Sequence, residues 1–262
     1  EENISAGRWQ EKSTNFRIWK LLETKIINFS SGVVLVSPKL KTLYRDVLQT
    51  EDFFAAPNNY PASFDVEAPD KMALPKKNYT LGYIGSFGHW NKAESYVRLL
   101  KNLNEEGGSR TTMLFLVRGE AKEALYEMLR FYGVDDSLVE VDTVPQEQVF
   151  DAIRQCRFGV YLMDSPDPRL GVKTVEYMRA GLPIIVSNNI LGAAEFVTTN
   201  NVGIVWDHTA LGVKAINQFI SADEGLREDM EFRCKRLAGE KMSPNAVAKK
   251  LISSYCLAFE RT

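Results

Sequence analysis

Short apolar segments alternate with helical patterns from about residue 78 onward, and this alternation limits the fold more than any other feature. Six apolar segments predict strands, and each is followed by a segment with helical spacing. Strands that alternate with helices form a parallel sheet covered on both faces. The fold class is therefore α/β, with a doubly wound parallel sheet. The predicted strands are Tyr79–Ile84, Thr112–Val117, Leu138–Val141, Phe158–Leu162, Ile184–Ser187 and Gly203–Trp206.

A smaller α/β lobe is predicted before this sheet. Helical spacing over residues 16–29 is followed by apolar strands at 32–37 and 53–56, with a helix from Ser37 to about Leu48 between them. Residues 58–78 contain three prolines and show no periodicity, which is typical of a linker. We therefore divide the chain into a lobe (1–60), a linker (61–77), a sheet domain (78–240) and a final helical segment (241–262).

Charge and cysteine content exclude several classes of function. The 262 residues carry a net charge of −2, so no basic surface for nucleic acid is expected. Three cysteines lie far apart, which argues against a disulfide framework or a zinc site and suits a reducing compartment. No apolar run approaches the roughly 18 residues of a transmembrane helix. We predict no metal site and no nucleic-acid partner.

Ligands of doubly wound sheets bind beyond the carboxyl ends of the strands, and this rule selects four loops. In the first, Gly85 and Ser86 would let backbone N–H groups approach a phosphate, and Lys92 would neutralise a diphosphate. In the second, the Arg118 guanidinium could fork onto a phosphate or carboxylate. The alternatives are a tight turn for the glycine loop, a solvated lysine, and a surface salt bridge from Arg118 to a nearby glutamate.

The third loop opens a short helix, predicted over 172–179, that carries the best pair of candidates. Lys173 and Glu176 are three residues apart, so they share a helix face. A carboxylate can accept two hydroxyls, as a ribose presents them, and a lysine can bind phosphate as a point charge. The alternative is an ion pair between the two side chains. In the fourth loop, Glu195 is a candidate, or only a carboxylate favoured by the helix dipole.

These segments together resemble retaining glycosyltransferases of family 4 (glycosyl transferases group 1), which have the GT-B fold. The resemblance covers about residues 78–207, in the family's order. It rests on Tyr83-Ile84-Gly85-Ser86-Phe87, Leu116-Val117-Arg118-Gly119, Val144-Pro145-Gln146-Glu147-Gln148-Val149, Cys156-Arg157-Phe158-Gly159-Val160, Val175-Glu176-Tyr177-Met178-Arg179-Ala180-Gly181-Leu182-Pro183, and Gly192-Ala193-Ala194-Glu195-Phe196-Val197.

The resemblance implies roles for single residues and shows two departures. Glu176 matches the family's ribose glutamate, and Lys92 matches its diphosphate lysine. The family's first glutamate, which usually binds the sugar, falls on Pro168, and its strand-end arginine falls on Ser86. Lys173 or Arg118 is our candidate to replace that positive charge.

Residues 1–60 resemble the end of the family's amino-terminal acceptor domain. We therefore expect this chain to be the carboxy-terminal, donor-binding part of a longer enzyme. We also expect the final helix to fold back on the first lobe.

The implied activity is transfer of a hexose-type sugar from a nucleoside diphosphate sugar to a hydroxyl of a saccharide or lipid-linked acceptor. The nucleotide sugar is a co-substrate, and no cofactor is implied. No catalytic residue can be assigned. Bacterial polysaccharide or glycoconjugate biosynthesis in the cytoplasm, with peripheral membrane association, follows by analogy. A nucleotide-sugar 2-epimerase of the same fold and a non-catalytic nucleotide- or partner-binding relative remain as alternatives.

Overall fold

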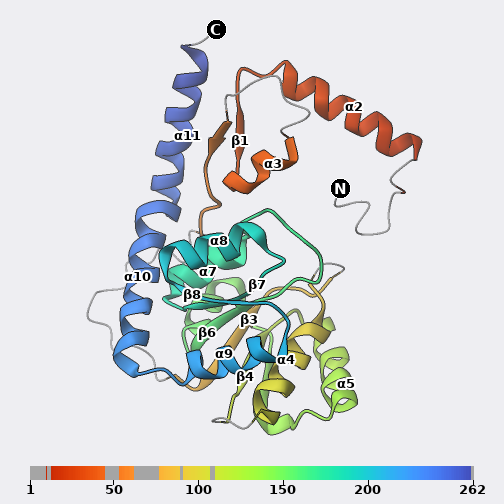
Figure 1. Cartoon of the computed structure of the whole chain (residues 1–262), viewed down its shortest axis with the longest axis vertical. Coiled ribbons are helices and arrows are strands. Elements are labelled where there is room, and N and C mark those ends of the chain that lie inside the picture. Colours follow the sequence, from red (N-terminus) through yellow and green to blue (C-terminus); the bar gives the residue numbers. More distant parts are fainter. Residues whose placement is uncertain are drawn as a thin grey trace.

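The computed structural model describes residues 10, 13–44, 53–61, 77–88, 91–106 and 110–260. They form a small two-stranded lobe and a larger domain built on a six-stranded sheet (Figure 1). Among these residues, no helix is both long enough and apolar enough to cross a membrane.

The six predicted strands form one fully parallel sheet in the order β5-β4-β3-β6-β7-β8. Strands β3, β4 and β5 therefore follow one another toward one edge of the sheet. The chain then returns to the centre, and β6, β7 and β8 follow one another toward the other edge. The point between β3 and β6 is the topological switch point, where doubly wound folds bind ligands. The α/β prediction is confirmed. The strands are β3 Tyr79–Ile84, β4 Met113–Leu116, β5 Val139–Asp142, β6 Cys156–Tyr161, β7 Ile184–Ser187 and β8 Gly203–Trp206.

Two helical layers cover the sheet, and each buries its own apolar core. One core lies under α6, α7, α8 and α10, and the other under α4, α5 and α9. Strand β7 shows why its sequence is apolar throughout: Ile184 and Val186 enter the first core, while Ile185 enters the second. The helices are α4 Ala93–Glu105, α5 Lys122–Tyr132, α6 Val149–Ile153, α7 Val172–Ala180, α8 Leu191–Asn200, α9 Ala210–Ile220, α10 Glu224–Met242 and α11 Pro244–Phe259.

Helical spacing in the sequence predicts helices over 146–155 and 224–238, and both differ from the structure in their bounds. The helix predicted over 146–155 is a 3₁₀ turn, Gln146–Gln148, followed by the short α6. The helix predicted over 224–238 continues through Gly239 to Met242, whose side chain is fully buried. Packing of that side chain outweighs the roughly 1 kcal/mol that a helical glycine costs. The helix predicted from Ser37 is described only as far as Tyr44.

The small lobe contains helix α2 (Thr14–Asn28), the parallel pair β1 (Val33–Leu35) and β2 (Phe53–Ala55), and the short α3 (Lys41–Tyr44). Helix α11 runs beside this lobe (Figure 1), and the Ala258 methyl lies 3.5 Å from where a Cβ on Gly32 would be. Most of the predicted linker, residues 62–76, lies outside the described residues. The division into domains stays a prediction.

A tyrosine from α7 joins the two central strands. The Tyr177 hydroxyl accepts a hydrogen bond from the Ile84 N–H of β3 and donates one to the Val160 carbonyl of β6, both at 3.1 Å. Its ring lies over Gly159, where a Cβ would be only 2.4 Å from the ring carbon Cγ. The glycine therefore allows α7 to pack this closely on the switch point.

Replacing Gly159 with alanine is expected to destabilise the protein by about 1–3 kcal/mol, because the new methyl group must displace a fully buried ring. Urea unfolding followed by circular dichroism would measure this. Gly239→Ala is the matched control, since no atom of the described residues lies within 4 Å of a Cβ there. That substitution should be neutral or stabilising. Equal unfolding midpoints for the two variants would contradict the packing argument.

Candidate functional site

A pocket of about 370 Å³, the strand-end pocket, lies at the carboxyl ends of β3, β4 and β5 beside the first turn of α7. This is the edge that the strand-end rule selects. The pocket brings together five of the seven predicted site residues, namely Gly85, Ser86, Arg118, Lys173 and Glu176. The rest of its lining includes Leu116, Thr143, Val144, Gln146, Val149 and Val172.

Lys173 is held between two tyrosine rings. Its Nζ lies 5.6 Å from the ring centre of Tyr83 on β3 and 5.5 Å from that of Tyr161 on β6. Gly85, at φ +120°, leaves space for it, because a Cβ there would lie 3.1 Å from the lysine Cε and Nζ. Burial lowers the pKa of Lys173, and the nearby Glu176 carboxylate opposes this shift. The ammonium is therefore costly to keep charged unless an anion joins it.

Glu176 shares the pocket with Lys173 without pairing to it. Burial raises the pKa of Glu176 to about 7, and the lysine charge only partly offsets this. Within the described part of the chain, neither side chain forms an ion pair within 4 Å or a side-chain hydrogen bond. The helix-surface ion pair considered as the alternative is thus absent. Both groups are left available to a ligand.

The first turn of α7 adds backbone donors. Gly171 precedes this nine-residue helix at φ +77°, and no side chain of the described residues caps its N–H groups. A Cβ on Gly171 would lie 2.6 Å from the Tyr161 ring, so the glycine also brings the helix start close to β6. Val172 in the first turn is 47% exposed and lines the strand-end pocket. Uncapped N–H groups at a helix start attract anions.

Arg118 completes the positive charge of the strand-end pocket. It follows β4, is exposed, and forms no ion pair with any glutamate among the described residues. The salt bridge proposed as its alternative is therefore absent. The Thr143 hydroxyl donates to the Val117 carbonyl at 2.8 Å, which holds the ends of β4 and β5 together beside this arginine.

Two predicted site residues lie outside the strand-end pocket. The Lys92 Nζ pairs with Asp164 at 3.2 Å, in the loop after β6. The Glu195 carboxylate pairs with Lys39 of the small lobe at 3.5 Å. Both pairs are substantially exposed. The roles of Lys92 and Glu195 in donor binding stay predictions.

The loop before α7 is fixed to the loop after β7. Asp167, only 5% exposed, receives three hydrogen bonds from the Arg169 guanidinium, the shortest at 2.7 Å from Nη2. Its backbone donates to Asn189 and accepts from Leu191, each at 2.7 Å. A Cβ on Gly192 would lie 2.5 Å from the Pro168 carbonyl. Pro168, at the position where the resemblance implies a sugar-binding glutamate, thus sits in a rigid loop.

Sequence reasoning missed the two tyrosines around Lys173 and the Asp167–Arg169 contact. Tyr83 and Tyr161 are largely buried strand residues, and nothing in their local sequence distinguishes them from residues of the core. The Asp-Pro-Arg sequence offers a weak local signal for the carboxylate–guanidinium contact. The described residues contain no group of three or more His, Cys, Asp or Glu side chains placed to hold a metal, and His89 lies outside them. The absence of a metal stays a prediction.

Comparison with known proteins gives one family and one fold. The family model described as "Glycosyl transferases group 1" matches residues 65–236. A comparison with curated protein sequences gives no match.

Several solved structures share the fold. S. aureus TarM, as a mutant crystallised with Fondaparinux, alpha-GlcNAc-glycerol and UDP, is 13% identical with a TM-score of 0.68 over 94% of this chain and 48% of its own. Sucrose-phosphate synthase from Thermosynechococcus elongatus is 17% identical with a TM-score of 0.71 over 97% of this chain and 64% of its own. Anabaena Alr3699/HepE with UDP and glucose is 15% identical with a TM-score of 0.68 over 95% of this chain and 68% of its own. This chain therefore spans about half the length of TarM.

Proposed function

This chain belongs to the group 1 glycosyltransferases, and from that premise we propose that its strand-end pocket binds a nucleoside diphosphate sugar for retaining, hexosyl-type transfer. One observation carries the proposal. The pocket holds the ammonium of Lys173 and the carboxylate of Glu176, one helical turn apart, both partly buried and neither with an ion-pair partner among the described residues. Such a pair is costly without a ligand that satisfies both charges.

A nucleoside diphosphate suits this arrangement. The diphosphate would lie between Lys173, Arg118 and the uncapped start of α7, where positive charge and N–H donors converge. The Glu176 carboxylate would accept hydrogen bonds from two ribose hydroxyls. The base would lie against the apolar part of the lining formed by Leu116, Val144 and Val149. Lys173 would thereby supply the positive charge of the family's strand-end arginine, which Ser86 replaces in this chain.

The transfer step requires charge stabilisation at the leaving diphosphate. The bond between the sugar anomeric carbon and the diphosphate oxygen breaks, and a bond from that carbon to the acceptor oxygen forms on the same face. The acceptor proton passes to the leaving diphosphate. Lys173, Arg118 and the N–H groups of α7 would stabilise the negative charge as it develops, which is the contribution that preorganised donors make to catalysis.

We infer that the acceptor is bound by a further lobe packed on α2, as in a complete enzyme of two lobes. Helix α2 buries none of its residues and exposes a stripe of large apolar side chains, Ile18, Leu22 and Ile26, which its C-cap residue Phe29 extends. Large apolar side chains that lie exposed side by side usually mark a contact surface. A saccharide or lipid-linked acceptor, use in polysaccharide or glycoconjugate biosynthesis, and a cytoplasmic or membrane-peripheral location belong to the same proposal.

Isothermal titration calorimetry with UDP, GDP and their sugars tests donor binding directly. We expect one nucleoside diphosphate to bind and inorganic pyrophosphate to bind much more weakly, because only the nucleotide reaches Glu176 and the apolar lining. Binding of no nucleotide would contradict the proposal. Equal binding of pyrophosphate would contradict the assignment of Glu176 and the apolar residues to the nucleoside.

A further inference from the structure

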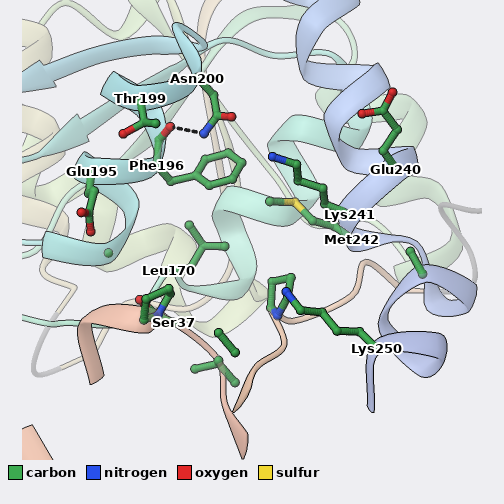
Figure 2. Close-up of a pocket in the computed structure, with 16 residues that line it drawn as sticks. Ser37, Leu170, Glu195, Phe196, Thr199, Asn200, Glu240, Lys241, Met242 and Lys250 are labelled. Atoms are coloured by element: carbon green, nitrogen blue, oxygen red, sulfur yellow. Dashed lines mark hydrogen bonds between the residues drawn. The ribbon is translucent and has the colours of Figure 1, made fainter. Parts of the chain in front are cut away.

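A second cavity, the junction cavity, lies where the small lobe meets the sheet domain (Figure 2). Its volume is about 560 Å³, and no residue that lines it also lines the strand-end pocket. Its walls come from four places: the ends of β1 and β2, the loop before α7, the length of α8, and the bend between α10 and α11. A ligand here would therefore touch the small lobe, the sheet domain and the bend between α10 and α11.

The inner wall of the junction cavity is apolar. Phe196 from α8, Leu170 from the loop before α7 and Met242 from the end of α10 converge on it, and Figure 2 shows the Phe196 ring directed toward the Met242 side chain. Pro38 and Pro57 of the small lobe complete this wall. A volume of this size suits a ligand with a sizeable apolar body.

The rim of the cavity carries uncompensated positive charge. Two carboxylates line it, and each already has a cation: Glu195 pairs with Lys39, and Glu240 with Arg236 at 3.4 Å. The two lining lysines, Lys241 and Lys250, form no ion pair with any described residue. Figure 2 shows both of their side chains reaching across the cavity, while Glu240 points away from it. The rim therefore favours an anion next to the apolar wall.

We propose that the junction cavity binds an amphiphilic anion, a molecule with an apolar body and one phosphate or carboxylate head. The body lies against Phe196, Pro38 and Pro57, and the head lies between Lys241 and Lys250. Because its walls belong to both lobes, such a ligand binds one relative arrangement of the lobes better than others and shifts the protein toward it. The site is separate from donor binding, so the proposal stands or falls independently of the strand-end pocket.

Decyl phosphate below its micelle concentration is the probe, and decanol is its uncharged counterpart. Calorimetry on the full chain is expected to show decyl phosphate binding and much weaker binding of decanol. The double variant Lys241→Gln/Lys250→Gln should weaken decyl phosphate binding by about tenfold, the sum of two partly exposed charge contacts. Lys249→Gln is the control, because this lysine is also exposed, lies next to Lys250 on α11, and does not line the cavity.

A second variant and a second source of the ligand complete the test. Ala246→Phe adds a ring to the lining and should block decyl phosphate while thermal unfolding stays cooperative. Sedimentation with phosphatidylglycerol vesicles separates the sources. Vesicle binding that both cavity variants lose identifies a lipid head group, and its absence identifies a free amphiphile. The proposal is overturned if decyl phosphate does not bind, if Lys249→Gln weakens it as much as the double variant, or if Ala246→Phe leaves its affinity unchanged.

Discussion

Replacing Lys173 with methionine is expected to weaken nucleoside diphosphate binding by about 10- to 100-fold, the loss of one charge-assisted contact worth about 1.5–3 kcal/mol. The same substitution is expected to raise the melting temperature of the unliganded protein. Burial lowers the pKa of Lys173, so the folded state disfavours its charge, and methionine keeps most of the apolar stem between the two tyrosine rings.

The opposite signs of these two effects make the prediction specific. If Lys173 were purely structural, its replacement would lower the melting temperature. If it were merely solvated, its replacement would change neither the melting temperature nor the nucleotide affinity. Calorimetry with the preferred nucleotide and a thermal melt without it measure both. Lys122→Met is the control, since this lysine is exposed at the start of α5 and does not line the strand-end pocket. Unchanged nucleotide affinity in Lys173→Met would exclude Lys173 as the diphosphate cation.

Replacing Glu176 with glutamine is expected to stabilise the unliganded protein at pH 8 but much less at pH 5. The pKa of Glu176 is about 7 in the folded protein, above the ordinary glutamate value of 4.5. Between these values the folded state keeps a proton that the unfolded state has lost, so this group makes stability fall as pH rises through about 7. Glutamine does not titrate, so the variant loses no stability in this way as pH rises. The melting temperature of Glu176→Gln relative to the parent protein should therefore increase from pH 5 to pH 8.

Nucleotide binding should respond to the same substitution in the opposite direction. The ionised carboxylate accepts hydrogen bonds from two hydroxyls, whereas the amide has only one oxygen. The ratio of parent to Glu176→Gln affinity is thus expected to rise as pH increases through about 7. Titration of the ligand phosphate is common to both proteins and cancels in that ratio. A ratio that is flat from pH 5.5 to pH 8 would show that Glu176 does not contact the ribose.

The sheet was largely predictable because its strands are buried on both faces and bounded by residues that end strands. Tyr79–Ile84 stops at Gly85, and Ile184–Ser187 begins after Pro183; both match the structure to the residue. The end of α10 was not predictable from local sequence, because burial of Met242 decides it. That burial depends on how α10 packs against the rest of the domain.

The strand-end pocket was predictable in part, for a similar reason. Spacing alone placed Lys173 and Glu176 on one helix face, and the strand-end rule placed Arg118 and Gly85 at the same edge. The environment of Lys173 depends on strand order, because β3, which carries Tyr83, pairs with β6, which carries Tyr161 about 78 residues later in the chain. Likewise, the Lys92–Asp164 pair joins two loops that only the return of the chain to β6 makes neighbours.

The contact between the loop before α7 and the loop after β7 has a consequence for engineering donor specificity. A glutamate-bearing segment from a relative could not be grafted into positions 164–171 alone. The present segment is hydrogen-bonded to the backbone at 189 and 191, and it packs so closely on position 192 that only a glycine fits there. The two segments form one exchangeable module, and they would have to be transplanted together. Chimeras that carry only one of them should fold with a displaced α7 and, with it, a misplaced Glu176 carboxylate, the group that we propose binds the ribose.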